Sequence, residues 1–408
     1  MKKKDKRSWL TYIAGLTVSA GFLLVASIAV SHAIDMLSAP PDPGFAVASI
    51  GDESVEAQEK GGNVQPVALY REQLIDNGEQ PSVHAATLVN LPDGDVGAFW
   101  FGGSREGGGD VEIWFARYDQ QTGNFSPARS VMSRQLLASQ LGRYIRKLGN
   151  PAAILDGNGQ VWLFFVSVSA GGWATSSINF IMSTDGGVTW SPARRLVTSP
   201  FFNVSTLVRN PPVNLTDGGL AIPIYHELAG KFAEILFVTA DGDIRQKVRV
   251  TWGRDALQPS LVPISESHAA VFMRYAGDPP MRMLFATTGD AGRTFDQPRS
   301  LDLPNADNSV AATRRGTEFW IVYNSSETGR GELSVAIHED ARRVARIYDL
   351  ESGEGGGGGE FSYPAIITDF RGRHHVAYTH KRQHIKHVVF NDVWLTQVRN
   401  TYPAELSP

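Results

Sequence analysis

Short hydrophobic runs separated by turn residues dominate the chain from residue 80 onward. The runs consist of Val, Ile, Leu, Phe, Trp and Tyr, and Asp-Gly or similar dipeptides interrupt them, with no amphipathic helix longer than a few turns. Runs of about four to eight apolar residues bounded by turn signals are typical of β-strands. We therefore predict an all-β domain.

Two segments carry a strong turn signature. Ser183–Trp190 has the sequence Ser-Thr-Asp-Gly-Gly-Val-Thr-Trp, and Thr288–Phe295 repeats it as Thr-Gly-Asp-Ala-Gly-Arg-Thr-Phe. In such a turn Asp accepts hydrogen bonds from backbone amides, Gly adopts a positive φ, and the aromatic residue anchors the returning strand. We expect Asp185 and Asp290 to have a structural role.

Two markers repeat along the chain in phase with each other. Weaker copies of the motif occur at Asp119, Asp241 and Asp340. Together with Asp185 and Asp290 they place a turn Asp at intervals of 66, 56, 49 and 50 residues. Strand starts with a polar residue recur at His84, Asn150, Asn210, Gln258, Asn308 and Tyr363. An interval of this length is typical of one propeller blade.

Six strand starts predict a six-bladed β-propeller. A single four-stranded blade cannot bury both of its faces, so the blades must stack in a ring around an axis. The innermost strand of each blade borders the central channel, and the six marker residues open these strands. We therefore expect the markers to converge at one end of the channel, where they would form the rim of a pocket.

The N-terminus has the composition of an export signal. Lys2, Lys3, Lys4, Lys6 and Arg7 precede an uncharged run over residues 10–30, and Ser31-His32-Ala33 offers a cleavage site. The run has 21 residues, enough to cross a bilayer, which takes about 20. We predict that residues 1–33 form a signal anchor in the membrane, with a cleaved signal peptide as the alternative.

The charge distribution places the rest of the chain outside the cytoplasm. Positive residues before the apolar run keep the N-terminus inside, so we expect an inner-membrane anchor with a periplasmic or extracellular propeller, or a secreted protein if the segment is cleaved. Residues 34–67 are rich in Pro, Gly, Ser, Glu and Asp and are predicted to be a flexible linker. Residues 68–408 form the predicted propeller.

Composition excludes several functional classes. The formal net charge is −4, and no long basic block follows the N-terminus, so a nucleic-acid partner is not expected. There is no Cys, hence no disulfide, thiolate metal site or Cys nucleophile. His374 and His375 are adjacent and would face opposite sides of a strand, so we predict no metal site and no cofactor. The sequence does not indicate an oligomeric state.

The complete turn motifs resemble the Asp-box, or BNR, repeats of the sialidase superfamily, and the bacterial sialidase-like proteins in particular. The resemblance covers roughly residues 80–395, and its most diagnostic stretches are residues 101–107, 209–212, 272–274 and 361–364. It implies a glycoside hydrolase, similar to the exo-α-sialidases, that acts on an acidic glycan or a surface polysaccharide.

The resemblance also implies roles for individual residues. In that family an Asp acts as acid/base, a Tyr is the nucleophile, and three Arg bind the substrate carboxylate. The matching residues here are Asp110, Tyr363, Arg105, Arg274 and Arg330. A neutral Tyr suits an anionic sugar, which would repel a carboxylate nucleophile, and guanidinium groups match the geometry of a carboxylate.

Two positions depart from the family pattern. His84 replaces the Arg of the opening Arg-Ile-Pro motif, and Gln258 replaces the Glu that would activate Tyr363. Gln258 cannot accept a proton, so Glu227 or Glu360 is the alternative base. His84 is a candidate base or anion ligand, because its charge changes near neutral pH. The other candidate substrate ligands are Glu106, Asn150, Arg209, Asn210, Gln258, Asn308 and Arg382.

These departures leave two other functions open. The first is a non-catalytic glycan-binding or scaffold propeller in envelope polysaccharide metabolism. The second is a polysaccharide lyase, in which His84 and Tyr363 would abstract the proton next to a uronate carboxylate. Among the Trp residues, Trp173 is the candidate for stacking on a sugar ring.

Overall fold

The computed structural model describes residues 43–47, 67–76, 78–199, 203, 205–339, 343–353 and 359–401. The predicted signal anchor lies outside these residues, as does the predicted linker apart from residues 43–47 and 67. Within the described ranges no helix is long and apolar enough to span a membrane. The anchor and the domain boundaries thus stay predictions.

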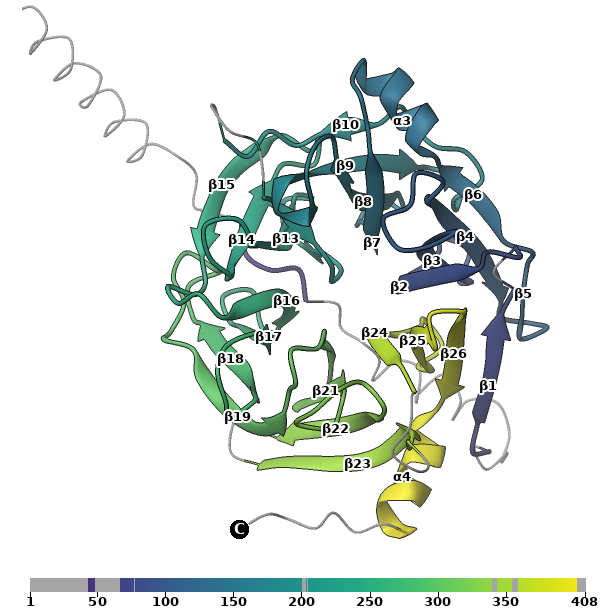
Figure 1. The fold of residues 1–408 in the computed structure, drawn as a ribbon. Coiled ribbons are helices and arrows are strands. Elements are labelled where there is room, and N and C mark those ends of the chain that lie inside the picture. Colours follow the sequence, from purple (N-terminus) through teal and green to yellow (C-terminus); the bar gives the residue numbers. More distant parts are fainter. Residues whose placement is uncertain are drawn as a thin grey trace, which may run out of the picture. The chain divides into compact units, whose positions relative to one another are not determined.

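Six antiparallel sheets follow one another around a common axis (Figure 1). Each sheet has four or five strands, and the innermost strands are β2, β7, β11 with β12, β16, β20 and β24. The predicted all-β, six-bladed propeller is confirmed.

Blades 1 to 3 account for residues 82–249. Blade 1 consists of β2 (Ser82–Asn90), β3 (Val96–Gly103), β4 (Glu112–Asp119), β5 (Asn124–Phe125) and β6 (Arg129–Met132), followed by helix α3 (Arg134–Leu141). Blade 2 consists of β7 (Lys147–Leu155), β8 (Val161–Val168), β9 (Ser176–Ser183) and β10 (Arg194–Arg195), with the short helix η1 (Trp173–Thr175) before β9. Blade 3 consists of β11 (Leu207–Val208), β12 (Val213–Asn214), β13 (Leu220–His226), β14 (Phe232–Val238) and β15 (Ile244–Arg249).

Blades 4 to 6 complete the ring. Blade 4 consists of β16 (Ala256–Pro263), β17 (Ala269–Tyr275), β18 (Arg282–Thr288) and β19 (Arg299–Pro304). Blade 5 consists of β20 (Ala311–Arg315), β21 (Glu318–Tyr323), β22 (Leu333–Glu339) and β23 (Arg343–Glu351). Blade 6 consists of β24 (Phe361–Thr368), β25 (His374–His380), β26 (His384–Phe390) and β1 (Tyr70–Ile75), and helix α4 (Asp392–Thr401) follows it.

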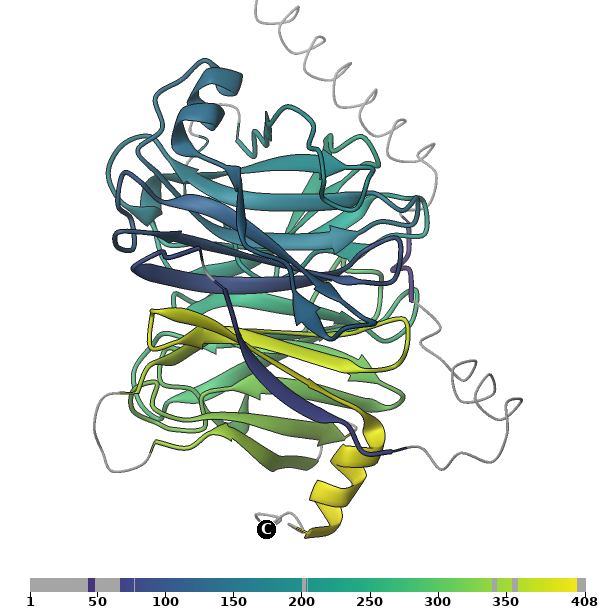
Figure 2. The ribbon, with the colours of Figure 1, turned by 90° about the vertical axis from the view of Figure 1, so that its right-hand side faces the viewer.

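The ring is closed by a strand from the other end of the domain. β1 precedes blade 1 in sequence but pairs antiparallel with β26, from Tyr70 opposite Phe390 to Ile75 opposite Ile385. The ring of Tyr70 stacks on Trp394 of α4 at 4.5 Å between centroids, and Figure 2 shows β1 and α4 on the same side of the domain. Closure of this kind ties the first and last parts of the ring together and covers the outer edge of blade 6.

The Asp turns form the hydrogen bonds that their sequence predicts. The Asp185 carboxylate accepts hydrogen bonds from the backbone N of Thr189 at 2.9 Å and from the Ser183 hydroxyl at 2.7 Å. Asp290 repeats the arrangement with the backbone N of Thr294 at 2.9 Å and the Thr288 hydroxyl at 2.8 Å. These carboxylates are therefore structural, as predicted.

Four of the innermost strands share an irregularity near their start. The pairing register shifts within β2, β7, β16 and β24, and at each shift one residue other than Gly has a positive φ: Ala85 at 54°, Asn150 at 48°, Gln258 at 51° and Tyr363 at 53°. A bulge of this type inserts a residue and re-aims the side chains around it. The repeated bulge thus positions the marker residues at one end of the axis.

The segment 43–47 packs at the opposite end of the axis. Phe45 is fully buried and forms a β-bridge with Leu215, next to β12. A cavity of about 460 Å³ lies beside it, lined by Ala46, Val47, Val213, Leu261, Val262, Pro263, Ala312, Thr313, Arg314 and Gly316. Most of these residues come from the far ends of the innermost strands β12, β16 and β20, so the cavity is separate from the site described below.

Candidate functional site

The starts of blades 1 and 6 bring His84 and Tyr363 into direct contact. Their ring centroids are 4.4 Å apart, with an angle of 65° between the ring planes. Two guanidinium groups lie near the same phenol ring, with the Cζ of Arg209 at 5.3 Å and that of Arg330 at 5.5 Å from its centroid. The predicted convergence of distant strand starts therefore occurs around Tyr363.

Arg209 lies behind Tyr363 in the protein interior. Its side chain is fully buried and donates hydrogen bonds to the carbonyl oxygens of Tyr363, at 2.5 Å, and of Pro364, at 3.0 Å. Its Nε and other terminal nitrogen have no hydrogen-bond partner among the described residues. Burial lowers the pKa of Arg209 to about 10, so it still carries a positive charge at neutral pH. The positive charge of Arg209 therefore lies directly behind the Tyr363 ring.

His84 is a neutral neighbour of these cations. The residue is 2% exposed, and neither ring nitrogen has a hydrogen-bond partner among the described residues. Burial, followed by the charges of Arg382, Arg330 and Arg209, lowers the pKa of His84 well below its ordinary value. His84 therefore does not replace the positive charge of the Arg that the resemblance leads one to expect at this position.

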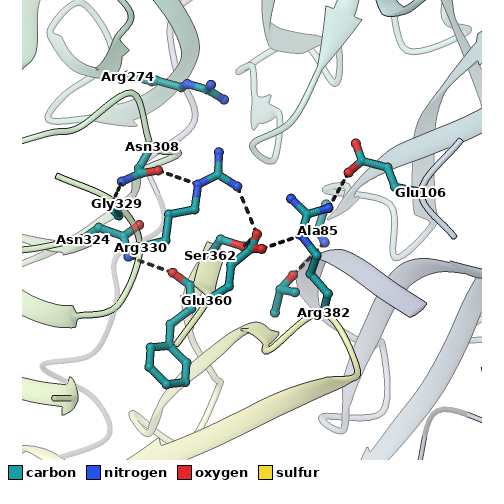
Figure 3. A network of polar contacts seen from close by, with 12 residues as sticks. Ala85, Glu106, Arg274, Asn308, Asn324, Gly329, Arg330, Glu360, Ser362 and Arg382 are labelled. Carbon is teal, nitrogen blue, oxygen red and sulfur yellow. Dashed lines mark hydrogen bonds and ion pairs between the residues drawn. The ribbon is translucent and has the colours of Figure 1, made fainter. Parts of the chain in front are cut away.

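A chain of ion pairs crosses the seam between blades 5, 6 and 1 (Figure 3). The Glu360 carboxylate accepts a hydrogen bond from Arg330 at 3.2 Å and another from the Nε of Arg382 at 2.5 Å. Arg382 donates in turn to Glu106 at 2.6 Å, and the Nε of Arg330 donates to the Asn308 side chain at 2.6 Å. Arg382 thus brings a guanidinium group from the β25–β26 turn to the side of the site where His84 lies.

Glu360 is held in its ionised form by this chain. Burial on its own raises the pKa of Glu360, but the hydrogen bond and charge of Arg382, together with Arg330, bring it below the ordinary value. A carboxylate stabilised in this way is a weak proton acceptor near neutral pH. The geometry therefore makes Glu360 an ion-pair partner.

Arg274 lies on the blade 4 side of the site. Its Nε donates to Asp307 at 2.7 Å, and a terminal nitrogen donates to the side-chain oxygen of Gln258 at 3.2 Å. Burial by itself lowers the pKa of Arg274, but Tyr363 and Asp307 raise it above its ordinary value. Gln258 thus accepts a hydrogen bond from the guanidinium group, as a carboxylate at this position would.

A second phenol, which the sequence did not single out, lies between the marker residues. The hydroxyl of Tyr225 accepts hydrogen bonds from Asn150 at 3.1 Å and from Gln258 at 3.4 Å. Burial, with the charges of Glu227 and Tyr363, raises the pKa of Tyr225, so it stays protonated. Its place two residues before Glu227 is the one sequence signal that would have pointed to it.

Asn210 and Glu227 complete this side. Asn210 is buried and donates to the carbonyl oxygens of Gln258 and Pro259, each at 3.0 Å, which ties blade 3 to blade 4. Burial raises the pKa of Glu227, and the charge of Arg274 opposes part of that rise. A half-buried carboxyl group with a raised pKa beside a charged partner is typical of a proton-transfer site.

Arg105 and Asp110 lie on the exposed loop between β3 and β4. The Asp110 carboxylate accepts hydrogen bonds from the backbone N and the hydroxyl of Ser104, both at 2.8 Å, and these bonds lower the pKa of Asp110. Among the described residues, Asp110 forms no hydrogen bond or ion pair with Tyr363 or with the arginines around it. Glu106, on the same loop, is the residue that reaches the site, through Arg382.

Solved structures of sialidases have the same fold. The chain superimposes on the Hadza microbial sialidase Hz136 with a TM-score of 0.62 at 16% identity, over 77% of this chain and 66% of that one. For the NanB sialidase of Streptococcus pneumoniae the TM-score is 0.63 at 11% identity, over 85% and 73% of the two chains. For Trypanosoma rangeli sialidase it is 0.63 at 11% identity, over 83% and 62%.

Another structural neighbour is a protein of unknown function. A protein of unknown function from Dyadobacter fermentans gives a TM-score of 0.65 at 12% identity, over 79% of this chain and 99% of that one. No curated protein matches the sequence significantly. The sequence profile of the BNR repeat-like domain matches residues 94–376, well over half of the chain. The protein therefore belongs to the BNR repeat-like domain family, with the fold of the sialidases.

Proposed function

We propose that the protein is a sialidase-like glycoside hydrolase that removes an anionic sugar from a glycan. The observation that carries the proposal is the environment of Tyr363, whose ring lies 5.3 Å from the Arg209 guanidinium and 5.5 Å from that of Arg330. Positive charge gathered around a phenol favours a negatively charged ligand there. It also supports the use of Tyr in place of a carboxylate nucleophile.

The proposed reaction assigns a role to each group. The Tyr363 oxygen attacks the anomeric carbon and the bond to the leaving oxygen breaks, while a carboxylic acid protonates that oxygen and a base takes the phenol proton. Water then displaces Tyr363 from the sugar. Arg274 and Arg330 bind the sugar carboxylate, and Arg382 supplies the third guanidinium in place of the one missing at His84.

Two carboxyl groups are candidates for proton transfer. Asp110 follows from the family resemblance and lies on a loop at the same end of the channel. Glu227 is favoured by its raised pKa and by the position of Tyr225, which interacts electrostatically with both Glu227 and Tyr363. Mutation distinguishes the two candidates, because Asp110→Asn and Glu227→Gln each remove one of the two carboxyl groups.

A panel of chromogenic glycosides tests the proposal. The panel comprises sialic acid, uronic acid and neutral sugars, and we expect turnover of an anionic member only. Tyr363→Phe should reduce kcat/KM by at least about 100-fold, as should loss of the carboxyl group that transfers the proton. Unchanged hydrolysis in Tyr363→Phe would refute the role of Tyr363.

A non-catalytic binding protein is the second candidate. The observation that favours it is the lack of charge at His84 and Gln258, combined with the Glu360 carboxylate that already occupies Arg330 and Arg382. Binding of an acidic glycan with no turnover of any member of the panel would support this candidate. Turnover with a product that absorbs in the ultraviolet would instead indicate a lyase.

We also propose that the propeller works outside the cytoplasm, tethered by the apolar run at residues 10–30. The support is the length of that run and the five positive residues before it. Cell fractionation tests this proposal. Recovery of the intact chain with the inner membrane is expected, and its recovery with the cytoplasmic fraction would contradict it.

A further inference from the structure

Four flat side-chain groups form a continuous stack on blade 3. The imidazole of His226 stacks on Phe232, with centroids 4.5 Å apart and an angle of 19° between the rings. The Cζ of Arg249 lies 3.2 Å from the Phe232 centroid and 5.4 Å from that of Trp252. We call His226, Phe232, Arg249 and Trp252 the blade 3 strip.

The strip leads outward from the catalytic end of the channel. β11, β13, β14 and β15 follow one another from the axis to the edge of blade 3, and Figure 1 shows β13, β14 and β15 in this order. His226 ends β13 and Arg249 ends β15. β13 runs antiparallel to β11, which starts at the end of the channel where Tyr363 lies. β13 and β15 therefore both finish at the end of the channel where Tyr363 lies, and Glu227 directly follows His226 in the sequence.

The loops that carry the strip are joined to the wall of the site. The backbone N of Ala276 donates to the carbonyl of Asp255 at 2.7 Å, and the Lys231 ammonium donates to the carbonyl of Ala276 at 3.2 Å. Ala276 lies two residues after Arg274. The strip thus continues the surface that begins with Glu227 and Arg274.

The outer part of the strip is exposed and apolar. Trp252 is 76% exposed and Leu228, on the neighbouring loop, is 56% exposed. Arg249 is fixed beneath by a hydrogen bond from its Nε to the carbonyl of Thr251 at 2.7 Å. One face of the indole is therefore supported by protein and the other is open to solvent, which is the arrangement that stacks on the face of a sugar ring.

Cationic side chains lie beside the strip. The buried Glu234 carboxylate pairs with Lys247 at 3.2 Å and with Arg249 at 3.9 Å, so two cationic side chains meet one carboxylate there, and the His226 ring lies 2.7 Å from the same carboxylate. Arg254 is exposed on the same loop as Trp252. Guanidinium and ammonium groups beside an aromatic platform are suited to sugars that carry carboxylates.

We propose that the blade 3 strip, together with Leu228 and Arg254, is a second binding surface that holds further units of an acidic oligosaccharide whose end unit lies at Tyr363. The inference rests on the proposed function for the orientation of the ligand. It makes the substrate a polymer or long oligomer with several acidic units.

Calorimetric titration with oligosaccharides of increasing length tests the proposal. The probes are oligomers of sialic acid and of galacturonic acid, each from one to five units, and the protein carries Tyr363→Phe to prevent turnover. We expect the affinity for one of the two series to rise with length. Trp252→Ala should reduce the affinity for the long oligomers by about tenfold and leave that for the single sugar unchanged.

Phe370→Ala is the matched control. Phe370 is 60% exposed and lies on the turn after β24, at the opposite end of the channel, so its loss should leave every affinity unchanged. Arg254→Gln should weaken binding of the long oligomers and reduce its dependence on salt. Neutral maltooligosaccharides should not bind, and binding as tight as that of the acidic series would overturn the assignment to acidic glycans.

The two proposals fail in different ways. The proposed role of the blade 3 strip is overturned if affinity does not rise with oligosaccharide length in either series. It is also overturned if affinity rises equally in Trp252→Ala and in the parent, even if a member of the glycoside panel is hydrolysed. Length-dependent binding that Trp252→Ala abolishes supports the strip even if no glycoside is turned over. In that case the proposed hydrolysis fails and the oligosaccharide surface stands.

Discussion

The imidazole of His84 packs edge-on against the phenol of Tyr363, and the two residues come from the first and last blades of the ring. Closure of the ring is what creates this contact, because 278 positions separate the two residues in the chain. The pair lies among Arg209, Arg330 and Arg382, which together lower the pKa of the buried imidazole after burial itself has done so. This relationship predicts how stability and function respond to pH and mutation.

Stability should fall below about pH 6.5 because His84 is buried in its neutral form. In the unfolded chain the imidazole takes up a proton near its ordinary pKa, whereas the folded protein resists protonation until well below that value. The unfolded state therefore binds more protons in this window, and the free energy of unfolding decreases as the pH falls. Urea denaturation between pH 4.5 and 8 measures the effect.

The variant His84→Phe isolates this contribution. It should reduce the slope of unfolding free energy against pH by up to about 1.4 kcal/mol per pH unit below pH 6.5. Equal slopes in His84→Phe and the parent protein would show that His84 does not titrate differently on unfolding.

Asp369→Asn should destabilise the seam between blades 6 and 1. The fully buried carboxylate accepts hydrogen bonds from His375 at 3.0 Å, Gln120 at 2.7 Å and Arg373 at 2.9 Å, and Gln120 belongs to blade 1. Removing one partner of a buried charged network costs about 3 kcal/mol. Urea denaturation at pH 7 should show a loss of this size.

The turn of blade 3 offers a matched control for Asp369. Asp217 has the corresponding place after β12, but its side chain is 37% exposed and pairs with Arg245 at the surface. Asp217→Asn should cost less than about 1 kcal/mol.

The effect of Asp369 should also depend on pH, because its pKa is held below the ordinary value. The stabilisation is present above the unfolded pKa of about 4 and is lost as the pH falls toward the folded value.

Glu360→Gln should strengthen the binding of a small organic anion. The Glu360 carboxylate bridges Arg330 and Arg382, so it competes with any bound carboxylate for the same donors. Gln at this position carries no negative charge, so both guanidinium groups keep more of their positive charge for the ligand. The affinity for sialic acid or galacturonic acid should therefore rise by about tenfold. Glu106→Gln, which contacts Arg382 alone, should have a smaller effect in calorimetric titration. Weaker binding in Glu360→Gln would show that Glu360 positions the arginines rather than competing for them.

Arg274→Gln should move the acidic limb of activity to higher pH if Glu227 is the base. The charge of Arg274 lowers the pKa of Glu227 against the larger effect of burial, so the pKa of Glu227 rises when that charge is removed. The ionised base is then lost at a higher pH as the solution is acidified. The dependence of kcat/KM on pH measures the midpoint, whatever the overall loss of rate.

Lys231→Gln is the comparison for Arg274→Gln. Lys231 also lowers the pKa of Glu227, by less than Arg274 does, so the limb should move in the same direction by a smaller amount. If the midpoint of the acidic limb of kcat/KM against pH is the same in both variants as in the parent protein, Glu227 is excluded as the titrating group. Asp110, whose pKa is lowered by Ser104, would then remain as the carboxylate to test.

The sequence by itself determined the architecture of the ring. The short apolar runs, the Asp turns at Asp185 and Asp290 and the polar strand starts are local signals, since each depends on hydrogen bonds or burial within one blade. They were sufficient to predict six blades and the gathering of His84, Gln258 and Tyr363 at one end of the axis. The position of β1 in blade 6 had no such signal, because a lone strand does not specify its partner.

The tertiary structure alone decided the chemistry of the rim. Arg382 reaches Glu106 and Glu360 from a turn in blade 6, Tyr225 accepts hydrogen bonds from blades 2 and 4, and Arg209 is buried behind Tyr363. Most of these contacts join different blades, and the geometry of all of them depends on how the ring closes and how its loops pack. Charge, burial and pKa arise from such contacts, so residue type and spacing could not specify them.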